Sequence, residues 1–404
     1  MIEELKQLLL QEHLERFAAE AFQIPQKPDH AEEKFICRIP SLDVFSMACW
    51  DGWDNVKPSQ PLPKGVIITS LREAKKQYGD LLAHYAMTRE PLNDFAAFNR
   101  KYADKGIFLY VEPNTEVKLP IQILNLMRMD TPAYIQMQNI VALGENSRLQ
   151  FIQCDDSFNL HCNFANHCTH VFMNRGAHLS YHKLQNINNE SGIMNTIRFF
   201  LQQDACLEAT CVSLNGSYVR NDLQVVFQGE HASADVNGLY LADRNQRVYN
   251  NIKVEHAQPN CRSQQCYKGI LDDAAEGAFK GYVKVYPHAF QTDARQTNRN
   301  ILLTDKAKID SQPFLEIDND DVKCSHGVTV GQLDEEALYY MRTRGISKQQ
   351  ATLLLMYAFC AEIVGKIKIG PLKEYLSFLV TQRLNGELNP CIHCVLPCDG
   401  GICN

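Results

Sequence analysis

From Gly106 to Gly331 the sequence is a succession of short β-type runs with no amphipathic helical pattern between them. Gly, Asn, Asp or Pro bounds each run, as is typical of strands joined by turns. The clearest runs are Ile107–Val111, Ile121–Leu126, Leu149–Ile152, Leu179–Leu184, Leu223–Phe227 and Tyr282–Tyr286. A doubly wound α/β fold needs a crossover helix between consecutive parallel strands, so this pattern argues against that fold class.

A weak internal repeat divides the same stretch. A small residue recurs after a polar turn, and an apolar or small residue follows it two positions later. The pairs are Ser147/Leu149, Ala177/Leu179, Ala205/Leu207, Ala232/Ala234, Ala275/Gly277 and Ala307/Ile309. Their first positions are 30, 28, 27, 43 and 32 residues apart, a near-regular period with one insertion. Such a repeat in a β-rich sequence predicts a solenoid, in which each coil buries its inner face by stacking on the next. A β-sandwich with evenly spaced hairpins remains the alternative.

Helical sequence flanks this β-rich stretch. Residues 1–20 and Arg72 to Met87 have helical spacing of apolar residues, with an irregular proline-rich segment between them. We therefore expect a mostly helical N-terminal domain over residues 1–105 and a β-solenoid core over residues 106–331. These flanking helices are expected to cap the solenoid, because its terminal strands would otherwise expose unpaired edges.

Residues 332–385 are predicted to form a helical C-terminal domain. One helix should run from Asp334 to Arg344, and Ser347 to Gln350 reads as a capping box for a strongly apolar helix. Gly370-Pro371 should end that helix, and a last short helix follows over Leu372–Leu384. This is more apolar surface than one small cap needs, which points to a partner protein.

Composition narrows the function classes. A net charge of -7 and a sequence pI near 6.0 give no attraction to nucleic acid. No apolar run is long enough for a membrane span, and the acidic start of the chain does not resemble a signal peptide, so we expect a cytoplasmic protein. There is no G-x-x-x-x-G-K-[ST] phosphate loop, no dinucleotide-binding G-x-G-x-x-G after a strand and no G-x-S-x-G nucleophile elbow.

Cys324 and His326 are the most informative candidate ligands. In an extended strand, residues two apart project from the same face, so thiol and imidazole would lie side by side. Both are ligand types for iron, zinc and sulfur-rich sites. Two ligands are too few for a closed zinc or iron–sulfur site, so a functional pair would need ligands from a second chain. On spacing alone, a buried Cys beside a hydrogen-bonded His is the commoner explanation.

Two other clusters hold potential ligands. Residues 161–170 contain five His and Cys residues, but their spacing matches no zinc motif and we expect them to lie at a turn without a metal. The tail, residues 386–404, carries Cys391, Cys394, Cys398 and Cys403. These cysteines could wrap a cluster or a zinc ion, or they could form a redox-active tail or an extension without a ligand. The remaining cysteines of the fifteen are expected to pack as small apolar residues.

The segment around Cys324 also resembles a known family. DNDDVKCSHGVTVG followed by LDEEALYYMRTRGIS is similar to the C-terminal signature of the SufB/SufD family of SUF-system iron–sulfur cluster assembly proteins. The sequence of this segment is more similar to the SufD branch, because the SufB branch would carry a Glu-His-Glu-Ala-Thr-like run here. Further similar segments lie at Gly281 to Leu303, Ser311 to Ile317, Pro61 to Leu71 and Asp104 to Asn114, so that the resemblance spans Pro61 to Lys368.

The resemblance implies a right-handed parallel β-helix and a non-catalytic scaffold subunit. It implies a SufB-type partner, with Cys324 and His326 helping to ligate iron or a transient iron–sulfur cluster at the shared interface. It also implies that a SufC-type ABC ATPase docks on the C-terminal helices, where Tyr357 and Phe359 are our candidate contacts, and that its ATP-driven dimerisation strains the pair. Whether a flavin joins the complex, and whether the chain alone forms a homodimer, are left open. The cysteine tail departs from the family pattern.

Two alternatives remain open. The chain could be a SufB-like primary scaffold, although the CSHG wording is the wrong signature for it. It could instead be a β-solenoid enzyme acting on polysaccharides, which would need paired carboxylates at a groove. Asp318, Asp320 and Asp321 lie close to the candidate ligands, but an export signal is missing.

Overall fold

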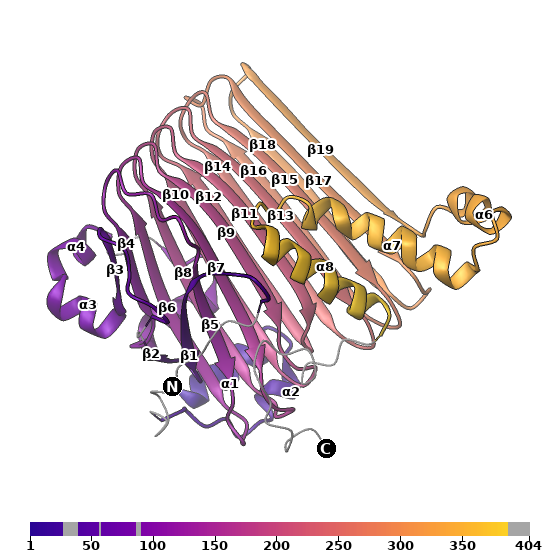
Figure 1. The fold of residues 1–404 in the computed structure, drawn as a ribbon, viewed down its shortest axis with the longest axis horizontal. Coiled ribbons are helices and arrows are strands. Elements are labelled where there is room, and N and C mark those ends of the chain that lie inside the picture. The colour runs from indigo at the N-terminus through magenta and orange to yellow at the C-terminus, as the bar shows by residue number, and fades with distance from the viewer. Residues whose placement is uncertain (27–38, 56–57, 86–89, 387–404) are drawn as a thin grey trace.

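The computed structural model describes residues 1–26, 39–55, 58–85 and 90–386, and the chain folds into a β-solenoid flanked by helices (Figure 1). The described strands form a 10-stranded sheet, ordered β19-β17-β15-β13-β11-β9-β7-β5-β1-β2, and a 9-stranded sheet, ordered β18-β16-β14-β12-β10-β8-β6-β4-β3, and from β4 onward successive strands alternate between the two. Neighbours pair in parallel except β1 with β2 and β3 with β4. Parallel pairing rules out the hairpin sandwich and confirms the predicted solenoid.

The strands of the 10-stranded sheet are β1 (Phe45–Trp50), β2 (Trp53–Asn55), β5 (Ile121–Met127), β7 (Arg148–Ser157), β9 (His178–Asn186), β11 (Cys206–Asn215), β13 (Ser233–Ala242), β15 (Arg262–Leu271), β17 (Thr292–Leu302) and β19 (Val322–Gly331). The other sheet contains β3 (Val66–Ser70), β4 (Ile107–Val111), β6 (Tyr134–Leu143), β8 (Phe164–Met173), β10 (Gly192–Leu201), β12 (Tyr218–Phe227), β14 (Arg247–His256), β16 (Glu276–Val285) and β18 (Lys308–Ile317). The helices are α1 (Ile2–Gln11), α2 (Glu15–Ala18), α3 (Leu71–Gln77), α4 (Gly79–His84), α5 (Asp94–Tyr102), α6 (Glu335–Thr343), α7 (Lys348–Val364) and α8 (Gly370–Leu384).

The turns between coils explain the sequence repeat. The small residue of each pair is buried directly before a strand, and at four successive coils the residue before it has a positive φ, for example Asp204 at 57° and His231 at 58°. A left-handed residue turns the chain, and only a small side chain fits inside the bend. The interval of 43 residues is not an insertion. Ala232 precedes β13, whereas Ala275 precedes β16 in the other sheet, and Cys261, 29 positions after Ala232, holds the missing place before β15.

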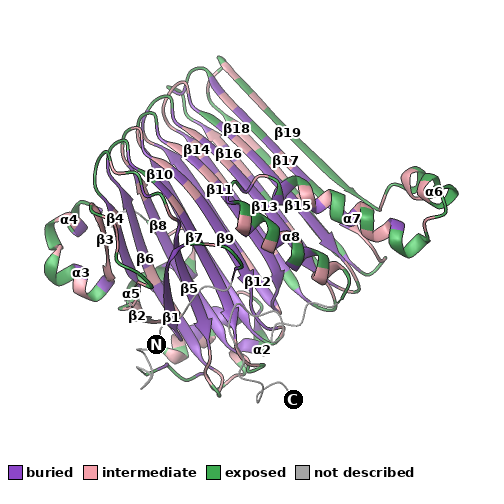
Figure 2. Cartoon of the chain, in the orientation of Figure 1, coloured by how far each residue is buried: buried purple, intermediate pink, exposed green. Residues whose placement is uncertain are grey.

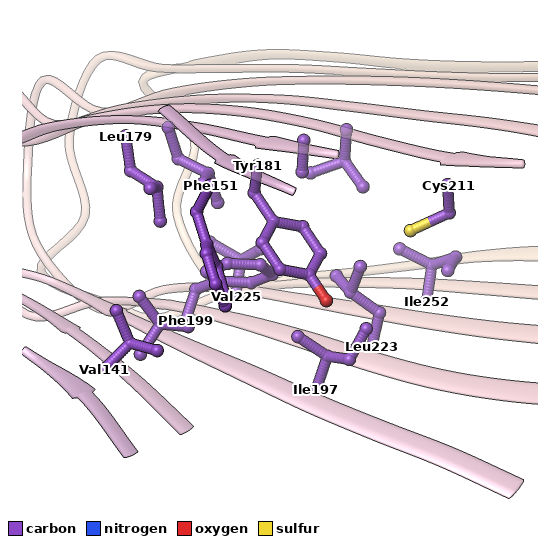
Figure 3. Packing of buried hydrophobic residues seen from close by; sticks show 14 of the residues in the cluster. Val141, Phe151, Leu179, Tyr181, Ile197, Phe199, Cys211, Leu223, Val225 and Ile252 are labelled. Atoms are coloured by element: carbon purple, nitrogen blue, oxygen red, sulfur yellow. The ribbon is translucent and has the colours of Figure 1, made fainter. Parts of the chain in front are cut away.

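The space between the sheets is filled mainly by apolar side chains that point inward from alternate strand positions (Figure 3). Phe151 and Tyr181 of the larger sheet meet Phe199 of the smaller one, and all three are fully buried. Burying such aromatic side chains stabilises the fold by roughly 2–3 kcal/mol each. Inward asparagines form a ladder within this core, from Asn195 through Asn221 to Asn250, with hydrogen bonds of 3.1 and 3.0 Å.

The helices do not cap the solenoid as predicted. Helices α7 and α8 instead pack on the outer face of the 10-stranded sheet, and α1, α2 and α5 pack on the outer face of the other sheet. Both outer faces carry apolar stripes, for example Leu184 and Val212 under the C-terminal helices and Phe164 under the N-terminal ones, and these stripes need cover. At the far end, β18 and β19 each have a strand neighbour on one side only, and most of β19 is exposed (Figure 2).

Local structure differs from the sequence prediction at two places and agrees with it at a third. The N-terminal region adds the strands β1 to β3 to the two sheets, which its irregular sequence does not announce. Gly370-Pro371 begins α8 rather than ending α7, as suits a proline in a first helical turn. The Ser347 hydroxyl accepts a hydrogen bond from the Gln350 backbone N–H at 3.2 Å, which confirms the predicted N-cap. Among the described residues, no helix has the length and apolar character required to cross a membrane.

Candidate metal-ligand site at the open edge

Strand β19 presents Cys324 and His326 on the same face, as predicted. Cys324 is in register with Ala294 of β17, and His326 is in register with Gln296 of β17. Ala294 and Gln296 are buried inward-facing residues, so both candidate ligands project from the inner face of the last strand. Cys324 is half-buried against the hydrophobic core, whereas His326 is exposed because no further coil covers it.

The environment of Cys324 keeps its thiol protonated at neutral pH. Burial raises the pKa of Cys324 above its ordinary value, and the charge of Asp293 adds to this increase. A hydrogen bond with the backbone of Ala294 opposes it but does not cancel it. A thiol with a raised pKa is a poor nucleophile, but a soft metal ion can displace its proton on binding. The raised pKa therefore argues against Cys324 as a nucleophile in covalent catalysis.

Within the described ranges, no group of three or more His, Cys, Asp and Glu side chains is arranged to hold a metal ion. Cys324 and His326 thus offer two donors at a strand whose outer edge has no neighbour among the described strands. The nearby carboxylate of Asp318 is paired with Lys284 at 2.6 Å.

Exposed apolar side chains also lie on the two terminal strands, β18 and β19. Val328 and Val330 of β19 and Phe314 and Ile317 of β18 are among the exposed large hydrophobic residues of the chain. Phe314 stacks on Tyr282 with ring centroids 5.5 Å apart and is still 56% exposed. Unpaired strand edges with exposed apolar residues are prone to pair with another chain.

The cluster at residues 161–170 lies only partly in a turn: His161 and Cys162 precede β8, as predicted, but the other three potential ligands lie within the strand. His167, Cys168 and His170 are buried in β8, where alternation sends His167 inward and the other two outward. Burial lowers the pKa of His170 to about 3 and raises that of Cys168 to about 12. Strand geometry therefore divides the potential ligands between the two faces of the sheet.

His167 belongs to a charged group inside the solenoid. Lys183 Nζ lies 2.5 Å from one carboxylate oxygen of Asp155, and His167 Nδ1 lies 3.4 Å from the other. Asn125 donates a hydrogen bond of 2.7 Å to the same carboxylate. Burial alone would raise the pKa of Asp155, but the Lys183 charge and the hydrogen bonds outweigh it and hold the pKa below its ordinary value. The sequence prediction missed this group, because ion pairs between successive coils become visible only when the register is known.

The two candidate docking residues on α7 face different ways. Tyr357 is exposed, whereas Phe359 is partly buried against the sheet, with Lys268 Nζ 4.3 Å from its ring centroid. Two other residues that the sequence prediction overlooked are more accessible: Tyr339 and Tyr340 of α6 are 71% and 58% exposed, and α6 buries none of its residues. A pair of aromatic residues on a helix without an apolar stripe was the signal that could have identified them.

The C-terminal helices are fixed to the sheet by charged side chains. Lys268 of β15 donates to the backbone oxygen of Phe359 at 3.1 Å and lies 2.5 Å from a carboxylate oxygen of Glu362. Arg383 of α8 donates to the backbone oxygen of Leu214 at 2.8 Å. The cysteines of the tail, Cys391, Cys394, Cys398 and Cys403, lie outside the described residues.

Two regions of the chain match known protein families. Residues 127–359 match the family described as "SUF system FeS cluster assembly, SufBD core domain", and residues 3–123 match the "SufBD protein N-terminal region". The chain belongs to the SufB/SufD family of iron–sulfur cluster assembly proteins.

Similar proteins include two that are named SufD. The chain is 35% identical to the iron-sulfur cluster assembly protein SufD of Escherichia coli over 210 residues, 52% of this chain and 50% of that protein. It is 25% identical to SufD of Bacillus subtilis over 327 residues, 80% of this chain and 74% of that protein. An iron-sulfur cluster assembly SufBD family protein of Synechocystis is 27% identical over 345 residues, 82% of this chain and 73% of that protein. The match thus spans about half of the E. coli protein and about three quarters of the other two.

Proposed function

We propose that this chain is a non-enzymatic, SufD-like scaffold subunit for iron–sulfur cluster assembly in the cytoplasm. One observation carries the proposal: Cys324 and His326, two soft ligands, lie side by side on a terminal strand with a free edge. In this proposal, incoming iron or sulfide is ligated there together with groups from a partner, so a transient cluster is cargo and not a resident cofactor. No observation on this chain assigns a flavin.

A SufB-type subunit would supply the missing ligands. The free edge of β19 offers unpaired backbone groups, and Val328 and Val330 offer exposed apolar contacts next to them. A partner strand pairing with β19 would lie about 4.8 Å away, which brings its side chains within reach of a metal bound to His326. The same edge is self-complementary in chemistry, so the chain could form a homodimer when its partner is absent.

A SufC-type ATPase would dock on the helical C-terminal region. Tyr339 and Tyr340 of α6 and Leu354 and Tyr357 of α7 expose large apolar side chains. Aromatic residues of this kind contribute strongly to binding when a partner buries them. Because α7 is tied to β15 through Lys268, movement of the docked ATPase would act on the solenoid itself.

Co-expression with cognate SufB-type and SufC-type proteins tests the proposal. The complex would be purified anaerobically through a tag on this chain, and bound iron, acid-labile sulfide and ATPase activity would be measured. We expect a stoichiometric complex with chelatable iron, and His326→Ala should lower the iron content while leaving the complex assembled. Ser325→Ala is the matched control, because Ser325 is exposed on the same strand but faces the opposite way. Recovery of this chain without partners or iron would refute the proposal.

A further inference from the structure

The register of the last three strands places an amide ladder behind the candidate ligand. Gln265 of β15, Gln296 of β17 and His326 of β19 occupy the same position in successive strands of the 10-stranded sheet. The Gln296 side chain is buried, and its Nε2 donates a hydrogen bond of 3.1 Å to Oε1 of Gln265. Neighbouring strands are about 4.8 Å apart, so side chains at equivalent positions stack directly on one another.

The oxygen of Gln296 is left for another neighbour. The nitrogen and oxygen of a carboxamide diverge from the same carbon, so a nitrogen that donates to Gln265 of β15 leaves the oxygen available to a donor from elsewhere, and the other strand beside β17 is β19. That oxygen is buried and has no hydrogen-bond partner among the described residues. A buried acceptor without a partner costs free energy, which makes a donor on the next strand the natural complement. The next strand carries His326 at this position.

The opposite sheet keeps the slot for this carboxamide open. A Cβ added at Gly281 of β16 would lie 1.6 Å from Gln296 Nε2 and 2.5 Å from its Cδ. Only a glycine at position 281 therefore leaves room for the Gln296 side chain in this orientation. Gln265 and Gly281, which lie on different sheets, thus hold the Gln296 carboxamide in one orientation.

From this geometry we infer that Gln296 is a positioning residue that accepts a hydrogen bond from the His326 ring and fixes its tautomer. A neutral imidazole carries one N–H, so a ring nitrogen that donates to Gln296 leaves the other nitrogen with a free lone pair for a metal. Metal-bound histidines usually donate their second nitrogen to such an acceptor, which orients the ring. The inference rests on the proposed function only where it assigns the free nitrogen to iron.

The hydrogen bond can be tested on the isolated full-length chain, before any partner is added. Histidine would be labelled with ¹⁵N, and the ring nitrogens of His326 identified by their loss in His326→Ala, at a pH where the ring is neutral. We expect two well-separated ring ¹⁵N shifts, the signature of a single tautomer. Gln296→Met should bring the two shifts toward a common value, as should Gly281→Ala if that variant folds. Gln312→Met is the matched control, because Gln312 is exposed on β18 and bonded to Asp310.

Iron binding separates this inference from the proposed function. In the assembled complex, Gln296→Met should weaken Fe²⁺ binding about 10-fold, the lower end of the usual loss when a partner behind a metal ligand is removed. Averaged ring shifts in the unaltered chain, or shifts that Gln296→Met leaves unchanged, would overturn the inference. A fixed tautomer combined with unchanged iron content in His326→Ala would instead reject His326 as a ligand and leave the contact with Gln296 standing.

Discussion

The buried pair of Asp155 and Lys183 allows a sharp prediction about stability. Both side chains are at most 2% exposed, and they join neighbouring strands inside the solenoid. Removing one member leaves the other charge buried without its counter-ion, which costs about 3–5 kcal/mol. Since the whole fold of a typical domain is stable by only about 5–15 kcal/mol, Asp155→Asn or Lys183→Met should lower stability by a large fraction.

Replacing both members tests the physical reason. The double variant Asp155→Leu/Lys183→Met has no buried charge at this position, and hydrophobic replacement of a buried ion pair is often neutral or stabilising. We therefore expect the double variant to be close to the unaltered protein and much more stable than either single variant. Urea unfolding followed by far-UV circular dichroism gives the free energies.

An exposed ion pair provides the control. Lys76 and Glu73 of α3 lie 2.8 Å apart in contact with solvent, so Lys76→Met should change the free energy of unfolding by less than about 1 kcal/mol. If the single variants at Asp155 and Lys183 behave like this control, the pair is not desolvated as the structure indicates. If the double variant is the least stable of the set, the charges themselves are stabilising and the reasoning fails.

Three further predictions concern pH, packing and docking. Burial lowers the pKa of three histidines: to about 3 for His170 and His256, and to about 4 for His182. Below pH ~6.5 the unfolded chain therefore binds more protons than the folded chain, so the free energy of unfolding should fall by up to about 4 kcal/mol per pH unit between pH 6 and 4. Urea unfolding midpoints at several pH values measure this fall. His182→Asn removes one of the three histidines and should reduce the dependence on pH by about a third. Gly238→Ala would place a Cβ 2.1 Å from the Tyr267 ring and should cost about 1–3 kcal/mol in urea unfolding, whereas Gly331→Ala meets nothing within 4 Å and should cost little. Tyr357 is exposed, so Tyr357→Ser should weaken capture of the SufC-type ATPase in a pull-down without changing the melting temperature. Phe359 packs against the sheet, so Phe359→Ser should lower the melting temperature. The opposite pattern would place the docking face on the side of Phe359.

The fold class could be predicted from the sequence because the same type of turn recurs between coils of the solenoid. At four successive coils a left-handed residue is followed by a buried small residue, for example Asp204 before Ala205, and this dipeptide is visible in the sequence. The position of the helices was not visible. An apolar helix such as α7 predicts that its side chains are buried against another surface, but not which one. Both the ends of the solenoid and the outer faces of its sheets could bury them.

Some features of the candidate site could likewise be predicted from the sequence, and others could not. Alternation along one strand is local, so the shared face of Cys324 and His326 followed from their spacing. The partners behind them did not, because Gln296 is 30 positions before His326 and its relation to it depends on the register of β17 with β19. Likewise, five ligand-type residues lie within ten positions, but two of them precede β8 and strand alternation divides the other three between its faces.

A connection between the proposed ATPase surface and the candidate ligand site can be tested through Lys268. Lys268 lies on β15, which pairs with β17, and β17 pairs with the ligand strand β19. Its contacts with Glu362 and Phe359 make it the charged link from α7 to this three-strand path. If ATP-driven movement of the docked ATPase reaches the ligands through α7, Lys268→Met should abolish the ATP-dependent change in the rate at which a chelator removes iron. Complex formation should persist, because the exposed aromatic residues of α6 and α7 are unaltered. Arg295→Met is the control, since Arg295 is exposed on β17 and bonded only within its own strand, to Asp293. An unchanged ATP response in Lys268→Met would show that the force, if any, reaches the site by another route.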